Sequence, residues 1–183
     1  MKGKDRRMLT AIALLIVRLV VGLALAAHGA QKAFGWFGGY GLKGTGGFFE
    51  SLGFRPGTVF AALAAAGEIG GGLLTAAGLL GPVGPALIIL VMIVAAGVAH
   101  FRNGFFAQNQ GYELNAMYIA LALVLAFVGF GAFSLDAAQG LTTLFTGSVN
   151  AIVIAAGIVF GFVNLGLRRM APAPQHSEVL QGG

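Results

Sequence analysis

The stretch that decides the fold runs from residue 9 to residue 32 and reads LTAIALLIVRLVVGLALAAHGAQK. Apart from Arg18, this stretch is apolar as far as Ala27. A hydrocarbon core about 30 Å thick requires about 20 predominantly apolar residues per helix. We therefore predict a first membrane span from Leu9 to Ala27.

The composition of the whole chain supports this prediction. Of its 183 residues, 57% are hydrophobic and 9% are charged, whereas a soluble domain carries about 25% charged residues. The chain is therefore expected to be an integral membrane protein that forms one compact bundle. It has no cysteine, which excludes disulfides, zinc–thiolate sites and cysteine nucleophiles. The net charge of +5 is split between the two ends and single interior positions, so no nucleic-acid partner is expected.

Four further apolar runs follow the first one. They extend over residues 57–80, 82–101, 113–130 and 149–167. Pro82 and Pro85 open the third span, at the helix start that tolerates proline best. The predicted fold class is an all-α, polytopic membrane bundle. The pairs Gly67 and Gly71, and Gly157 and Gly161, have the spacing that lets membrane helices approach closely.

The basic N-terminus, residues 1–8, is not interpreted as a secretory signal, because Arg18 interrupts the apolar stretch and no clean cleavage site follows. Its charge predicts a cytoplasmic location, although Lys and Arg are more numerous on the opposite side. The tail over residues 171–183 is rich in proline and polar residues, which predicts disorder. Its ending, SEVLQGG, can be a processing scar.

Two loops, residues 28–56 and 102–112, fall on the same side of the predicted bundle and are rich in aromatic residues. Aromatic side chains with polar edges prefer the membrane interface. Within the first loop, Thr45 to Leu52 predicts a short interfacial helix. These loops are expected to form one face of the protein.

Two charges, Arg18 and Glu68, fall inside predicted spans, where each costs at least about 2.5 to 3.5 kcal/mol unless it finds a partner. Arg18 precedes His28 by ten residues and Glu68 follows Gly57 by eleven, so both are expected about 15 Å below one surface. If these two helices are antiparallel neighbours, the two side chains come within reach of each other. The sequence therefore predicts an Arg18–Glu68 ion pair. The pair can be structural, or it can be part of a ligand or proton site, and both readings stay open.

Further polar residues gather toward the same end of the predicted bundle. At about 100° per residue, His28 and Lys32 lie on the same stripe of the first helix as Arg18. The candidate residues for ligand binding or proton transfer are Arg18, His28, Lys32, Glu68, His100, Arg102, Asn103 and Glu113. Glu113 can equally cap its helix. Two histidines at one depth also fit haem, but interfacial histidines more often serve hydrogen bonding and proton transfer, so neither haem nor a metal is expected.

Six segments in order resemble the DoxX family of small bacterial membrane proteins. They are LIVRL at 15–19 with HGAQK at 28–32, GFFESLGF at 47–54, GEIGGGLL at 67–74, HFRNGFF at 100–106, GYEL at 111–114 and GAFSLD at 131–136. The resemblance implies a four-helix membrane bundle over residues 9–136 in the plasma membrane of a bacterium. Residues 137–170, with the run at 149–167, then supply a linker and a fifth membrane helix outside the family pattern.

The resemblance also raises the expectation of quinone and redox chemistry, because some relatives form a membrane subunit of a thiosulfate:quinone oxidoreductase. The first functional hypothesis is a membrane subunit of a redox system whose polar site binds a quinone or a similar small molecule. No redox cofactor motif is visible, so electrons would come from an oxidoreductase partner. The alternative is a non-catalytic anchor or assembly factor for a soluble oxidoreductase. Membrane lipid and a second copy of the chain are the other partners considered, and no catalytic residue is assigned.

Overall fold

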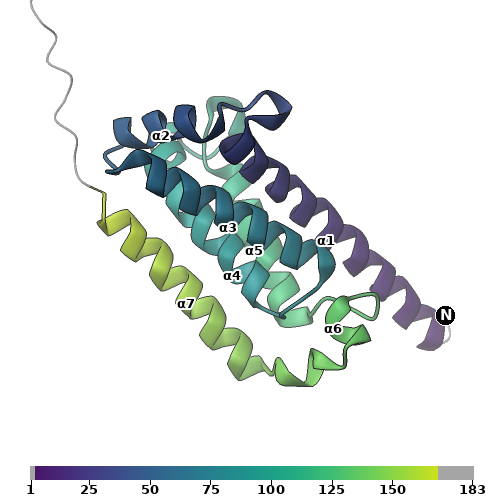
Figure 1. Ribbon diagram of the computed structural model, residues 1–183. Helices are drawn as coiled ribbons and strands as arrows, with labels where there is room; N and C mark the ends of the chain where they lie inside the picture. Colours follow the sequence, from purple (N-terminus) through teal and green to yellow (C-terminus); the bar gives the residue numbers. More distant parts are fainter. Residues whose placement is uncertain (1–2, 169–183) are drawn as a thin grey trace, which may run out of the picture.

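The structure is a computed structural model that describes residues 3–168, and every regular element in that range is helical (Figure 1). Five long helices form the body of the molecule. They are α1 (Gly3–Phe34), α3 (Gly57–Ala77), α4 (Val83–Ala95), α5 (Glu113–Val128) and α7 (Gly147–Gly166). Each coincides with one of the five predicted apolar runs, so the all-α prediction is confirmed.

Shorter elements connect these helices. The helix α2 (Gly41–Ser51) confirms the predicted short helix but begins before Thr45. Beyond Ala95, α4 continues as a π-helical turn (Ala96–His100) and then as a 3₁₀ turn (Phe101–Asn103). The remaining pieces are α6 (Leu135–Ala138) and 3₁₀ turns at Trp36–Gly38, Ala107–Asn109 and Leu141–Leu144.

Four of the helices are long and apolar enough to cross a membrane, which makes the protein a multi-pass membrane bundle. They are α1, α3, α4 with its continuation to Asn103, and α7. The fourth predicted span is shorter than expected, because α5 has 16 residues and at 1.5 Å per residue reaches about 24 Å. The outer faces of α1 and α7 expose large apolar side chains such as Ile16, Leu23, Ile152 and Phe160, as lipid contact requires.

The helix α4 is the centre of the bundle. It packs against α3, α5 and α7, while α1 and α3 form the most extensive helix pair. The main core cluster draws on four helices, with Leu25 from α1, Ile88 and Ile89 from α4, Ala122 from α5 and Ile154 from α7. This packing fixes the position of α4 relative to its neighbours, and with it the start of the π-helical turn that carries His100.

Small residues set the contact between α1 and α3. A Cβ atom on Gly22 would lie 2.4 Å from the carbonyl oxygen of Gly72, and one on Gly72 would lie 2.5 Å from that of Gly22. The two backbones therefore touch, as in other close membrane helix pairs. The predicted glycine contacts are confirmed as well, because a Cβ on Gly71 would meet Leu87 and one on Gly157 would meet Ala86.

The bundle has two distinct ends (Figure 1). The loop end consists of residues 35–56 and 101–112, and the turn end consists of residues 78–82 and 129–146. The first residues of α1 extend away at the turn end, whereas α7 finishes at the loop end, where Nε of Arg168 donates to the carbonyl of Leu52. The predicted tail at 171–183 lies outside the described residues.

Candidate functional site

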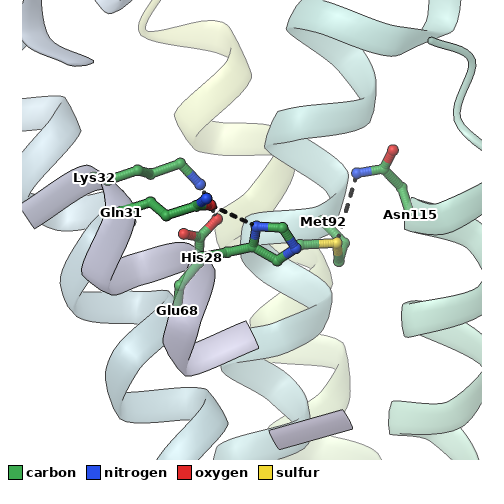
Figure 2. Close-up of polar contacts among 6 residues, drawn as sticks. All are labelled: His28, Gln31, Lys32, Glu68, Met92 and Asn115. Carbon is green, nitrogen blue, oxygen red and sulfur yellow. Dashed lines mark hydrogen bonds and ion pairs between the residues drawn. The ribbon is translucent and has the colours of Figure 1, made fainter. Parts of the chain in front are cut away.

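A partly buried ion pair joins α1 to α3 near the loop end. The ammonium of Lys32 donates to Oε1 of Glu68, while the carboxylate itself is buried between the helices. Figure 2 shows both side chains reaching toward each other beside His28 and Gln31. The second carboxylate oxygen, Oε2, is buried and has no hydrogen-bond partner. A buried carboxylate oxygen without a donor costs free energy, so this atom marks a place where a ligand group or water is required.

The predicted Arg18–Glu68 ion pair is wrong. The close contacts of Gly22 with Gly72 and of Gly29 with Ile69 set the register between α1 and α3. In this register Gly29 lies against Ala65 and Ile69, and the side chain that reaches Glu68 comes from Lys32. The prediction ended the first span at Ala27 and matched depths from His28, but α1 continues to Phe34 and so shifts the surface outward along the helix.

Arg18 lies at the turn end instead. Its Nη1 donates to the carbonyl of Phe130 over 3.3 Å, and its Nη2 donates to the carbonyl of Phe133. The guanidinium packs against Gly78, where a Cβ atom would lie 2.2 Å from Nη1. Arg18 therefore fastens the segment after α5 to α1 and α3, and it takes no part in the polar group around Glu68.

The two histidines line one cavity of about 410 Å³, which we call the central cavity. Glu68 reaches it from α3, His28 from α1 and His100 from the π-helical turn after α4. Its other lining residues are Leu25, Met92, Ala95, Ala107, Gln110, Gly111, Leu114, Asn115 and Tyr118. The volume falls within the range of about 300 to 1,000 Å³ that is typical of small-molecule sites.

The position of His100 depends on the π-helical turn. This turn changes the backbone path over Ala96–His100, and π-helical turns are frequent at functional sites. The ring is then held by the loop that follows, because Nδ1 of His100 lies 2.7 Å from the carbonyl oxygen of Gln110. Asn103 supports the same loop by donating to the carbonyls of Ala99 and Gln110. Asn103 thus acts on the shape of the loop and does not line the central cavity.

Glu113 and Arg102 lie outside the central cavity. Oε2 of Glu113 accepts a hydrogen bond of 2.8 Å from the backbone N–H of Ala107, and Glu113 opens the first turn of α5. Its observed contact is therefore with the loop that precedes α5. Arg102 is exposed in the 3₁₀ turn and does not line the cavity.

The polar residues Asn115 and Tyr118 are cavity residues that the sequence interpretation missed. They are three residues apart on α5, so they share one face of that helix. Asn115 is buried and its amide donates to Sδ of Met92 at 3.5 Å. A buried asparagine within an otherwise apolar run was the signal available in the sequence, since polar groups at membrane depth normally face the bundle interior.

Two neighbouring cavities meet the central one at the Lys32–Glu68 pair. A cavity of about 570 Å³ lies between α1 and α2 and is lined by His28, Lys32, Tyr40 and Phe48, among others. A smaller cavity of about 170 Å³ is lined by Lys32, Phe48, Glu68 and His100, among others. The ion pair therefore stands where three cavities converge beneath α2.

Comparison with protein families finds one match to this chain. The family model described as DoxX matches residues 13–101, which extend from the first turns of α1 to the end of the π-helical turn. The matched range includes His28, Lys32, Glu68 and His100, and it ends before the motifs at 111–114 and 131–136. Searches of curated proteins and of solved structures give no match.

Proposed function

Because residues 13–101 form a DoxX domain within a multi-pass membrane bundle, we propose that the central cavity binds the head group of a membrane-soluble quinone. The protein then serves as the membrane subunit of a quinone-linked redox system. The observation that carries this proposal is the cavity that Glu68 lines together with two histidines, where Oε2 of the buried carboxylate has no hydrogen-bond partner.

The lining of the cavity matches the two parts of such a ligand. A quinone head group combines an apolar ring with two oxygen atoms at opposite positions. Leu25, Met92 and Leu114 supply apolar surface for the ring, while His28 and His100 supply polar groups for the oxygens. Sites for small molecules commonly combine an apolar lining with a few placed polar groups.

The cavity also contains groups suited to proton transfer. A quinone gains two protons and two electrons when it becomes a hydroquinone, so its site needs groups that hold and release protons. Imidazoles change charge near neutral pH, and His28, His100 and Glu68 line the same cavity. Electrons come from an oxidoreductase partner in this proposal, because the sequence shows no redox cofactor motif.

The test is to measure the quinone that copurifies with the full chain in mild detergent. The double variant Lys32→Met/Glu68→Leu replaces the ion pair with apolar side chains and leaves neither charge unpaired. We expect the wild-type protein to carry extractable quinone and the double variant to lose at least about 90% of it, a tenfold loss that equals about 1.4 kcal/mol of binding.

The matched control is Glu50→Gln, which neutralises an exposed carboxylate at the same end whose contact is with the backbone N–H of Gly57. This variant should keep its quinone. The proposal is overturned if wild-type protein binds neither endogenous nor added quinone, or if the folded double variant binds it as well as wild type.

Exposed aromatic residues at the loop end favour a second candidate function, that of a non-catalytic anchor for a soluble oxidoreductase. Trp36, Phe37, Tyr40, Phe101 and Phe106 are all exposed there. In this case the double variant Trp36→Ala/Phe105→Ala should release a membrane-bound oxidoreductase activity into the soluble fraction. The Lys32→Met/Glu68→Leu variant should retain that activity, which separates the two candidates.

A further inference from the structure

We propose that the central cavity prefers the reduced, hydroxyl-bearing form of its ligand, a hydroquinone, over the oxidised quinone. This inference rests on the proposed function and assigns the chemical form that the cavity recognises. It follows from hydrogen bonds that determine which polar atoms in the cavity carry protons.

His100 presents a hydrogen-bond acceptor. Its Nδ1 lies 2.7 Å from the carbonyl oxygen of Gln110, and a backbone carbonyl can only accept a hydrogen bond. Nδ1 must therefore carry the proton and donate it. In the neutral ring, protonation at Nδ1 leaves a free lone pair on Nε2 of His100.

The contact of His28 with Gln31 likewise places the proton of the His28 ring on Nδ1. The amide nitrogen of Gln31 donates to the carbonyl of Phe37 over 3.2 Å, which determines the orientation of the amide group. Its oxygen, Oε1, then faces Nδ1 of His28 at 3.0 Å, as Figure 2 shows. An amide oxygen only accepts, so Nδ1 of His28 donates and its Nε2 also has a free lone pair.

Glu68 adds the third acceptor. Lys32 occupies Oε1 of the carboxylate, and Oε2 is buried without a donor. A carboxylate has acceptors only, so Oε2 remains an unmatched acceptor on a residue that lines the cavity. Three elements thus contribute acceptors: α1, α3 and the turn after α4.

Donors are fewer in the same cavity. The amide of Asn115 donates one N–H to Sδ of Met92 and keeps a second, and the amide of Gln110 and the hydroxyl of Tyr118 can each donate or accept. A hydroquinone has two O–H donors at opposite ends of its ring and can satisfy two acceptors at once. The carbonyls of a quinone only accept, so they find no donor at the two Nε2 atoms. Polar groups left unmatched when the ligand displaces water weaken the binding of that form.

The experiment compares the two forms of one short-chain benzoquinone analogue by calorimetry on the full chain in detergent, with the reduced form kept under anaerobic conditions. We expect the hydroquinone to bind at least tenfold more tightly than the quinone. Equal binding, or tighter binding of the quinone, overturns this inference while the proposed function stands. If neither form binds, the proposed function falls with it.

The variant Glu68→Gln provides a directed check. Lys32 only donates, so the amide oxygen of the variant side chain would face Lys32 and its NH₂ group would replace Oε2 at the cavity. One acceptor becomes a donor, and the preference for hydroquinone should fall about tenfold or reverse. Glu50→Gln, the same change outside the cavity, should leave the preference unaltered. An unaltered preference in folded Glu68→Gln contradicts the role assigned to Oε2.

A second measurement needs no substitution. Nitrogen-15 NMR of histidine-labelled protein distinguishes the two neutral tautomers of each ring. We expect the rings of His28 and His100 to be protonated at Nδ1 and unprotonated at Nε2. If either ring carries its proton on Nε2, the cavity offers a donor at that position and the inference is overturned.

Discussion

The loop end and the turn end of the bundle both bury charged side chains, and the comparison between them separates a candidate site from a structural clamp. Arg18 at the turn end and Glu68 toward the loop end are each 3% exposed. Arg18 donates to two carbonyls of the segment after α5, has its Nε buried without a partner, and does not line the cavity at that end. Glu68 leaves one oxygen unpartnered in a cavity that it shares with two histidines. Equal burial therefore does not imply an equal role for the two residues. The role depends on whether the charged side chain contacts other protein groups or lines an open cavity.

Asp136 is a second charged residue at the turn end whose side chain contacts the backbone. Its two carboxylate oxygens accept hydrogen bonds of 2.9 and 2.7 Å from the backbone N–H groups of Leu80 and Gly81. Its own N–H donates to the carbonyl of Gly78. Asp136 thus closes the connection between α3 and α4, and with Arg18 it uses side-chain charge to satisfy backbone groups that helices leave free at their ends.

The largest effect on stability is expected from Arg18→Leu. The substitution removes two hydrogen bonds from a charged group and leaves the carbonyls of Phe130 and Phe133 without donors, which should lower the free energy of unfolding by about 3 kcal/mol. Thermal unfolding in detergent measures this loss. The protein that remains folded should bind quinone with unchanged affinity. Weakened binding would show that the two ends are not independent.

A smaller loss is expected from Asp136→Ala, which deprives the N–H groups of Leu80 and Gly81 of their acceptor. At about 1 kcal/mol for each net hydrogen bond, the free energy of unfolding should fall by about 2 kcal/mol. The variant Asp136→Asn keeps one acceptor oxygen and should lose about half as much. Equal losses in the two variants would contradict the two-bond description.

At the loop end, Lys32→Met/Glu68→Leu should weaken binding strongly and change stability little, which is the opposite of the result expected for Arg18→Leu. Replacing a buried ion pair with apolar residues of similar volume is often neutral or stabilising, so the free energy of unfolding should change by less than about 1 kcal/mol. Quinone binding should weaken at least tenfold, or about 1.4 kcal/mol. A large loss of stability together with intact binding would assign the pair to structure, like Arg18.

The smallest effect is expected from Arg102→Ala. Arg102 is exposed and lies outside the central cavity, so both quinone affinity and the free energy of unfolding should change by less than about 0.5 kcal/mol. Isothermal titration and thermal unfolding check this expectation. A marked loss of binding would extend the site outward to the 3₁₀ turn, where the sequence interpretation placed it.

Much of the fold could be predicted from the sequence because the signals are local. The length of an apolar run is set by membrane thickness, so runs such as residues 57–80 and 149–167 indicated helices close to the observed α3 and α7. Glycine spacing indicated close contacts, as Gly71 and Gly157 confirm. The C-terminal end of α1 is harder to predict, because Phe34 lies in a segment whose polar and aromatic residues are typical of a loop.

The candidate site could be predicted in part. His28, Lys32, Glu68 and His100 were identified because ionisable and imidazole groups are rare in such a chain, and all four lie at the loop end. Asn115 and Tyr118 were missed because neither carries a charge at neutral pH. The sequence interpretation groups three further residues with the site because they lie near it along the chain: Arg102, Asn103 and Glu113. Nearness along the chain does not reveal the direction in which a side chain points.

The amino-acid sequence by itself determined the membrane class of the protein, the number of its long helices and the small set of ionisable groups among which a site could lie. Only the tertiary structure decided that Glu68 pairs with Lys32 and that Arg18 binds backbone carbonyls. The physical reason is that an ion pair depends on the register between two helices. That register is set by backbone contact between Gly22 and Gly72 and by the extension of α1 to Phe34. The hydrogen bonds of the two histidine rings depend in the same way on Gln31 and Gln110.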